Sequence, residues 1–534
     1  MEINTVLSRR AFVTTAMLVV GGVAVAACSP GGNKGGNGAA SNVLSVAASA
    51  AVTTWDPVRS FSTEALYLGN IYEPLIWKNA EGAQEAFSPG IATDWKTSDD
   101  GLSWTFTIRS GATFHDGEAV DAAAVKASID AAKENGGASF IWAPLKSVEA
   151  PDASTVVMHL EYPAPMDLVA ASTYGAWIVS PKALAAVKAD KTYFDAGVDG
   201  GSGPYKLASY VPGQKVVLES YADYWNKEAM PSYTTVDISI TPDAVTAQQM
   251  LTAGEVDFAT NVPLENAKDL AAGGDYKVQE YNSPFNYLAF FNTTKPPLDN
   301  VKVREALSYA MPYADIIEIG GQGYGTQSHG PVPKGIFPYA DSVPQYKQDL
   351  DKAAALLAEA GHPGGGFSLN LSYASENPAE ARFVPLIKDA LAKVGVEVTV
   401  RAELFNQQWE SAKADPKSAQ DIFVLYYWPT YSDAGADNLY SLFHSSEKPY
   451  FNLSYWNNAD YDALVDKAGK LAGTDKEAAG KVYREAMDVL YKEAPGAFFY
   501  DAHAVSVIPN GLTFGKFNEN YPFTVFFAPV RPSS

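Results

Sequence analysis

Strict alternation between apolar and polar side chains occurs at several places along the chain. Residues 104–108, 236–240 and 396–400 each alternate in this way, which is the period of a strand with one face buried. A shorter stretch at 256–258, which reads Val-Asp-Phe, follows Gly254. We therefore predict strands at these four places.

Helix-capping residues precede the runs whose apolar positions are three or four apart. A short polar side chain at such a position accepts hydrogen bonds from the first free N–H groups of a helix. Pro378 and Gly395 also stand where a helix begins and ends, as helices prefer. The predicted capping residues are Asp121, Asp243, Asp299, Asp349 and Asn377. Because these helices alternate with strands, the pattern predicts an α/β protein with βαβ units.

One strand differs from the others because it is apolar on both faces. Residues 422–428 read Ile-Phe-Val-Leu-Tyr-Tyr-Trp, which is typical of a central strand in a parallel sheet covered by helices. Ligands of open α/β sheets bind beyond the carboxyl ends of the strands. Tyr426, Tyr427, Trp428, Tyr431 and Asp433 are therefore candidate ligand contacts. The alternative is that the aromatic side chains belong to the core, and it is strongest for Tyr427.

The N-terminus has the pattern of an export signal. Arg9 and Arg10 precede an uncharged apolar run at 11–27, which is shorter than the about 20 residues that span a bilayer. We predict a signal peptide at 1–27. The run ends in Val-Ala-Ala before Cys28, which resembles the lipobox of bacterial lipoproteins and predicts lipid on that cysteine. An ordinary secretory signal is the alternative.

Two finer features accompany this signal. Residues 8–13 resemble a twin-arginine export signal, with a generic basic region as the alternative. Residues 28–42 are rich in Gly, Asn, Ala and Ser, and such a segment buries too little apolar surface to fold. We expect a flexible tether there.

Composition narrows the function classes. The chain has 534 residues and a net charge of −22, which argues against nucleic-acid binding because that requires a basic surface. Its length predicts two or three domains. Cys28 is the only cysteine, so no internal disulfide can form.

Catalytic signatures are largely missing from the sequence. None of the six histidines pairs with another at metal-ligand spacing, residues 200–204 do not form a nucleophile elbow, and residues 321–325 lack the dinucleotide-binding spacing. His115-Asp116-Gly117 is typical of a turn. We predict no enzyme activity, no catalytic residue, no cofactor and no metal site. A lipid-anchored secreted hydrolase remains the rival hypothesis.

Several segments, in order, resemble family 5 of the extracellular solute-binding proteins, the peptide, nickel and oligosaccharide receptors of ABC importers. The block at 98–117 is the most recognisable of them. The others are residues 55–57, 70–75, 203–205, 254–257, 291–294, 297–307, 356–361 and 455–468. Together they extend over about 43–500, which is the whole predicted mature domain.

The resemblance implies an α/β, two-lobed periplasmic-binding-protein (Venus flytrap) fold with an extra α+β domain inserted in one lobe. By position, lobe I comprises 43–75, 200–288 and 497–534. The extra domain is 76–199 and lobe II is 289–496. Ligand is expected between the lobes.

The resemblance also implies a function. We expect a monomeric substrate-binding lipoprotein on the extracytoplasmic face of a bacterial membrane, which delivers an oligopeptide or dipeptide to a permease and its ATPase. A non-peptide solute, such as an oligosaccharide or a nickel chelate, is the alternative. The candidate ligand-binding residues are Phe61, Asn286, Tyr287, Tyr426, Trp428, Tyr431 and Asp433.

One position departs from the family pattern. Peptide receptors of the family often have an aspartate three residues after the tryptophan that matches Trp428, where it pairs with the peptide amino group. Here that position is Tyr431, and the nearest carboxylate is Asp433. Asp433 is expected either to replace that aspartate or to leave a site that stacks on a non-peptide solute.

Overall fold

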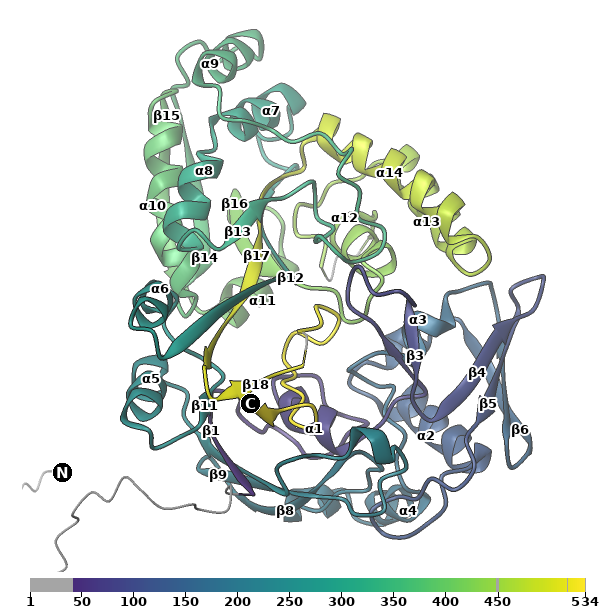
Figure 1. Ribbon diagram of the computed structural model, residues 1–534. Coiled ribbons are helices and arrows are strands. Elements are labelled where there is room, and N and C mark those ends of the chain that lie inside the picture. The colour runs from purple at the N-terminus through teal and green to yellow at the C-terminus, as the bar shows by residue number, and fades with distance from the viewer. Residues whose placement is uncertain (1–41, 448–450, 516, 534) are drawn as a thin grey trace, which may run out of the picture. The chain divides into compact units, whose positions relative to one another are not determined.

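The computed structural model describes residues 42–447, 451–515 and 517–533 (Figure 1). The predicted signal peptide, Cys28 and the tether up to residue 41 lie outside these ranges. Within them, no helix combines the length and the apolar character that crossing a membrane requires.

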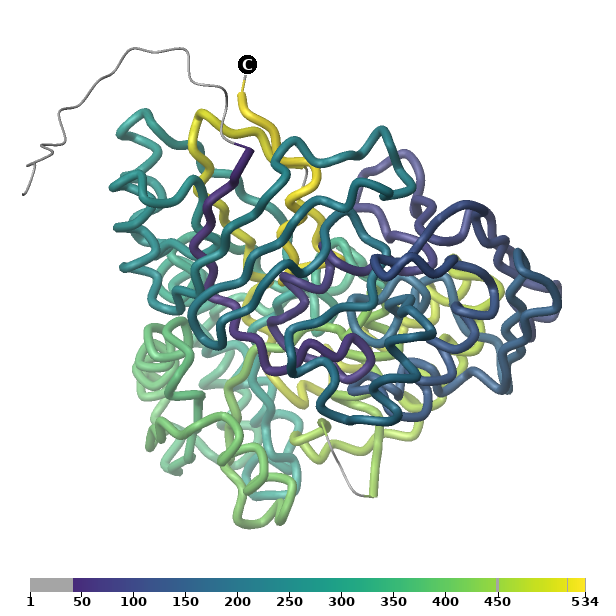
Figure 2. Tube along the Cα trace, turned by 90° about the horizontal axis from the view of Figure 1, so that it is seen from below, coloured from purple at the N-terminus to yellow at the C-terminus, as the bar shows by residue number. Residues whose placement is uncertain are grey.

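A five-stranded sheet contains the first strand of the described chain. Its order is β11 (Phe258–Ala259), β1 (Val43–Ala48), β10 (Thr235–Ile240), β9 (Lys215–Ser220) and β8 (Tyr205–Val211). β1 runs parallel to both β10 and β11, and β8, β9 and β10 are antiparallel. Figure 2 shows β1, in purple, among the teal strands. The strand predicted at 236–240 is confirmed, whereas the one at 256–258 is shorter and begins at Phe258.

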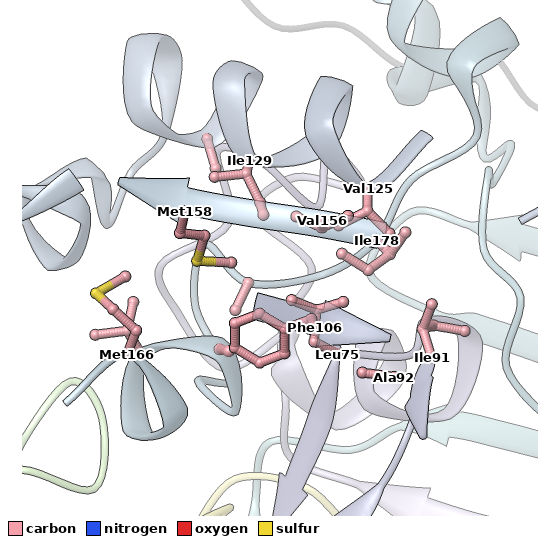
Figure 3. Packing of buried hydrophobic residues seen from close by; sticks show 14 of the residues in the cluster. Leu75, Ile91, Ala92, Phe106, Val125, Ile129, Val156, Met158, Met166 and Ile178 are labelled. Atoms are coloured by element: carbon pink, nitrogen blue, oxygen red, sulfur yellow. The ribbon is translucent and has the colours of Figure 1, made fainter. Parts of the chain in front are cut away.

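A four-stranded antiparallel sheet lies within residues 92–160. Its order is β4 (Ala92–Thr97), β5 (Ser103–Ile108), β7 (Thr155–Leu160) and β6 (Leu145–Asp152). Helix α2 (Ala122–Asn135) begins at the predicted cap Asp121, which accepts a hydrogen bond from Ala124 N. In Figure 3 the α2 side chains Val125 and Ile129 face the sheet residues Val156 and Met158.

The third large sheet has six strands. Its order is β13 (Gly325–Gln327), β17 (Gly496–Pro509), β12 (Tyr276–Phe291), β16 (Ile422–Tyr427), β14 (Phe367–Ala374) and β15 (Val396–Glu403). β16 is central and buried, but it is parallel to β14 and antiparallel to β12. The expectation of a parallel sheet is therefore wrong on the β12 side, because an apolar run reports burial of both faces and not the direction of the neighbouring strand.

Most predicted helix caps are confirmed. Asp243, Asp349 and Asn377 accept hydrogen bonds at the starts of α5 (Ala244–Ala253), α9 (Leu350–Glu359) and α10 (Pro378–Ala392). The prediction for Asp299 is wrong. The cap of α7 (Val301–Ala310) is Asn300, whose side chain accepts from Lys302 N. Two adjacent capping residues are equivalent in sequence, and the backbone conformation chooses between them.

The antiparallel pair of β12 and β17 joins two of the sheets. Tyr276 pairs with Pro509 at one end and Phe290 with Gly496 at the other, with a break in register between Asn282 and Asn286. Near the first end, Val278, Val505 and Val507 pack with side chains of β1, α5 and α6 (Leu264–Ala272). Beyond the break, β12 also pairs with β16, which continues the six-stranded sheet. The pair therefore connects the five-stranded sheet to the six-stranded sheet.

The predicted turn at His115–Gly117 is confirmed. Gly117 has φ 88°, and His115 Nδ1 lies 2.6 Å from Asp199 Oδ1. The remaining elements are α1 (Ala65–Ile71), α3 (Met166–Ala170), α4 (Pro181–Ala189), α8 (Tyr313–Asp315), α11 (Phe405–Ala414), α12 (Tyr440–Phe443), α13 (Ala459–Ala472), α14 (Lys476–Glu493), β2 (Ile76–Lys78), β3 (Phe87–Pro89), β18 (Leu512–Thr513) and β19 (Arg531–Pro532).

Candidate functional site

Four aromatic side chains meet at the carboxyl end of β16. Trp428 stacks on Tyr426 at 5.4 Å between ring centroids. Its edge contacts are Phe285 of β12 at 5.6 Å and Phe523 of the C-terminal segment at 5.5 Å. We call these four residues the β16-end cluster. Trp428 is partly exposed, so the cluster is not sealed in the core.

Two buried carboxylates shape the chain that follows Trp428. Asp437 accepts hydrogen bonds from Thr430 N at 2.6 Å and from the Tyr427 hydroxyl at 2.8 Å. Asp433 Oδ1 accepts from the backbone N–H groups of residues 435 and 436. These bonds fix the path of the loop and thereby the position of Trp428.

The second oxygen of Asp433, Oδ2, is buried and has no hydrogen-bond partner among the described residues. Asp433 as a whole is 1% exposed. Burial raises the pKa of this carboxyl to about 6, because a low-polarity environment disfavours its charged form. A buried polar atom without a partner calls for an explanation such as a water or a bound group.

The loop after Trp428 also touches the region of the four-stranded sheet. Tyr431 is partly buried and packs against the hydrophobic cluster of that region. Ser172 Oγ lies 3.5 Å from the Thr430 carbonyl oxygen. At the start of α14, Lys476 Nζ lies 2.6 Å from Asp167 Oδ2. Residues 428–431 therefore lie where the end of β16 in the six-stranded sheet meets the region of the four-stranded sheet.

Tyr287 extends the β16-end cluster inward. Its ring lies parallel to Tyr500 at 4.7 Å and contacts Tyr426 at 5.6 Å. Beside these rings, Glu380 accepts hydrogen bonds from Ala374 N and from the Asn377 side chain. Burial raises the pKa of Glu380 to about 8. This second layer supports the partly exposed aromatic side chains.

Asn286 has a structural position. It is fully buried, and its amide nitrogen donates to Ser328 Oγ, Gly330 O and Asp501 Oδ1. Burial raises the pKa of Asp501 to about 6. The donors of Asn286 are thus used to anchor the loop around 328–334 to β12 and β17.

Phe61 stands in another aromatic group. Its ring is 48% exposed and lies 5.1 Å from Tyr174 and 6.0 Å from Phe140, which is itself 50% exposed. The Tyr174 hydroxyl donates to Ser62 O, and Tyr174 lies two residues after Ser172. Exposed large apolar side chains that gather in this way often mark a binding surface.

The structure thus brings Tyr287, Tyr426 and Trp428 into one aromatic group and places Tyr431 directly after it. Asn286 and one oxygen of Asp433 are bonded within the protein, and Phe61 lies in the separate group with Tyr174 and Phe140. Sequence reasoning missed Phe285, Phe523, Phe140 and Tyr174, since nothing in their local sequence distinguishes them from core residues. In the part of the chain that the structure describes, no group of three His, Cys, Asp or Glu residues could hold a metal ion.

Aromatic faces with a few hydrogen-bonding groups suit non-covalent binding of a small molecule. Comparison with known proteins agrees with this chemistry. Residues 86–450 match the model of the bacterial extracellular solute-binding proteins, family 5 Middle. The glutathione-binding protein GsiB of Salmonella typhimurium is 30% identical over 411 residues, covering 76% of this chain and 78% of that protein.

Two further comparisons extend the match. Heme-binding protein A of Haemophilus influenzae is 32% identical over 453 residues, covering 79% of this chain and 80% of that protein. The crystal structure of the ABC transporter substrate binding protein CtaP of Listeria monocytogenes has a TM-score of 0.82 and 23% identity, with 92% of this chain and 100% of that chain covered. The fold is the α/β, two-lobed periplasmic-binding-protein fold. The chain belongs to family 5 of the bacterial extracellular solute-binding proteins, which are binding proteins and not enzymes.

Proposed function

We propose that this protein is the solute receptor of an ABC importer, and that it holds its solute between two lobes at the β16-end cluster. The observation that carries the proposal is the position of Trp428. It is a partly exposed tryptophan at the end of a central strand, beside the contact between Thr430 and Ser172. Such a strand end is where open α/β sheets bind ligands.

The proposed lobes follow the sheets. Lobe I would comprise 43–75, 200–288 and 497–534, with the five-stranded sheet as its centre. The extra domain, 76–199, would hold the four-stranded sheet, and lobe II, 289–496, would hold most of the six-stranded sheet. A solute that touches both lobes only when they are closed stabilises the closed state by that differential contact.

We propose a short peptide as the solute. Glutathione, which the relative GsiB is named for, is itself a tripeptide. An amino terminus requires a hydrogen-bond acceptor, and none of the described residues donates to Asp433 Oδ2. The ring faces of Trp428 and Tyr426 would hold the apolar part of the peptide. A sugar or another planar solute would use the same rings, and an oligosaccharide or a nickel chelate is therefore the second candidate.

Thermal unfolding of the mature domain tests the receptor function. A ligand that binds only the folded state stabilises it by RT ln(1 + [L]/Kd), about 2.7 kcal/mol at a hundredfold excess over Kd. Glutathione, dipeptides, oligopeptides, oligosaccharides and nickel chelates form the panel. A raised Tm with one class supports the proposal, and an unchanged Tm with all classes contradicts it.

The role of Asp433 has its own test. We expect a dipeptide with a free amino terminus to bind the wild-type protein more tightly than its N-acetylated form. Asp433→Asn keeps the shape of the side chain and removes its charge, so the preference for the free amine should disappear. If Asp433→Asn retains the wild-type preference, another group binds the amine.

We further propose that lipid on Cys28 holds the receptor at the membrane, after export by a signal that resembles the twin-arginine type. Two or more acyl chains anchor a protein firmly, because each buried methylene contributes about 0.8 kcal/mol. Cys28→Ala should move the protein from the membrane pellet to the soluble fraction. Retention of this variant in the pellet would contradict lipid anchoring.

A further inference from the structure

A cavity of about 400 Å³ lies apart from the β16-end cluster. All of its lining residues fall within 69–79, 204–281 and 506–529. It is bounded by α1, β2, the first half of β12, the end of β17 and the C-terminal segment. Its volume is within the range of ordinary ligand pockets.

Three aromatic pairs build the wall of this cavity. Phe258 contacts Phe514 at 4.5 Å, Tyr281 stacks on Phe517 at 5.0 Å, and Trp77 contacts Tyr521 at 5.2 Å. In each pair, one ring comes from a strand and the other from the C-terminal segment. Phe526 adds a further ring at 5.4 Å from Trp77. Figures 1 and 2 show this segment, in yellow, beside α1 and β1.

The charged groups of the lining are already bonded within the protein. Glu73 accepts hydrogen bonds from the Tyr224 hydroxyl at 2.5 Å and from Trp77 Nε1 at 3.0 Å. Lys78 Nζ donates to the carbonyl oxygens of Asn79 and Ala86. These hydrogen bonds hold both side chains against the cavity wall. An uncharged ligand avoids the cost of burying a charge of its own.

The amide of Asn70 is also committed. Its nitrogen donates to Leu66 O and Val525 O, and its oxygen accepts from Phe527 N. These bonds tie α1 to the C-terminal segment, so the cavity has a fixed frame. What the frame offers to a ligand is mainly the faces and edges of aromatic rings.

We propose that this cavity is a second binding site, for a small uncharged aromatic compound. Offset-stacked and edge-to-face ring pairs attract one another beyond the effect of area burial, and a planar ligand adds such contacts on several sides. The site is independent of the solute at Trp428. The same segment separates the two, because Phe523 faces Trp428 and Phe285 while its neighbours Tyr521 and Thr524 line the cavity.

Titration of the mature domain with indole tests this site by calorimetry. We expect saturable binding of one indole per chain. Ala528→Trp should fill the cavity and weaken indole binding by about tenfold or more. Trp428→Ala, which lies outside the cavity, should change the indole affinity by less than about twofold. The folded state of each variant is checked by its thermal unfolding.

Each outcome decides the proposal. Absence of saturable binding by the wild-type protein overturns it, as does wild-type affinity in Ala528→Trp or loss of indole binding in Trp428→Ala. If Ala528→Trp does not fold, crystals of the wild-type protein soaked with 5-bromoindole replace it. A bromine anomalous peak between Trp77 and Tyr281 supports the site, and a peak elsewhere or no peak overturns it. Loss of solute binding in Trp428→Ala with indole binding intact separates this site from the proposed receptor site.

Discussion

The β16-end cluster and the cavity of the C-terminal segment are both rich in aromatic side chains, but their polar groups differ. At the cavity, Glu73 and Asn70 are fully engaged by protein donors and acceptors. In the loop that follows Trp428, Asp433 keeps one buried oxygen to which no described residue donates. Aromatic content alone therefore does not distinguish the two regions. The difference lies in the polar groups, which are bonded at the cavity, whereas Asp433 Oδ2 is available to a ligand near Trp428.

The largest expected effect separates site aromatics from core aromatics. Trp142 is buried and donates to Gly175 O at 2.9 Å, so Trp142→Ala should lower the free energy of unfolding by about 3–5 kcal/mol. Trp428→Ala should cost about 1–2 kcal/mol, since part of the ring is already exposed. Urea unfolding of both variants measures the difference. Equal losses would mean that Trp428 is a core residue.

The bonded carboxylate of the cavity gives a pH-dependent effect. Burial raises the pKa of Glu73 to about 7, so its contribution favours folding below the unfolded pKa and is lost as pH rises through about 7. Tyr224→Phe removes one of its donors and raises that pKa further. We expect a loss of about 1–3 kcal/mol at pH 9 and a smaller loss at pH 5.

A second tyrosine provides the control for this experiment. The Tyr205 hydroxyl donates to Tyr233 O, which does not titrate. Tyr205→Phe should therefore lower the free energy of unfolding equally at pH 5 and pH 9. If the Tyr224→Phe loss is also independent of pH, Glu73 is not bonded as described.

The smallest expected effect concerns the ion pair between Lys476 and Asp167, which joins α14 to the region of the four-stranded sheet. The lysine side chain is 37% exposed, so Lys476→Met should cost only about 0.2–1 kcal/mol. The pair joins two regions that are proposed to approach each other on closure. Loss of the pair in Lys476→Met should therefore lower solute affinity and make that affinity less dependent on salt. Lys481→Met, which breaks an exposed pair within α14, should leave solute affinity unchanged. Identical affinities in the two variants would exclude a role in closure.

Local features of the fold were predictable because local chemistry determines them. The caps Asp121 and Asn377 were identified from neighbouring residues, and residues 422–427 from an apolar run. The direction of β12 beside β16 was not predictable, because burial is the same for parallel and antiparallel neighbours. The sequence could not distinguish Asp299 from Asn300 as the cap of α7, because both residue types can cap a helix.

Only the part of the candidate site that follows β16 was predictable. Trp428 follows a recognisable strand, so its sequence position indicates a role. Phe285 and Phe523 reach it from distant segments, and no local pattern predicts that contact. The whole cavity depends on pairs between strands and the C-terminal segment, such as Trp77 with Tyr521, and was therefore missed.

The most direct test of the account is calorimetric titration of the wild-type protein and Trp428→Ala with glutathione and with dipeptides. The account predicts saturable binding of one solute per wild-type chain and an affinity about tenfold or more weaker in Trp428→Ala, with the variant still folded. Equal affinity in the two proteins would contradict the assignment of the β16-end cluster as the solute site.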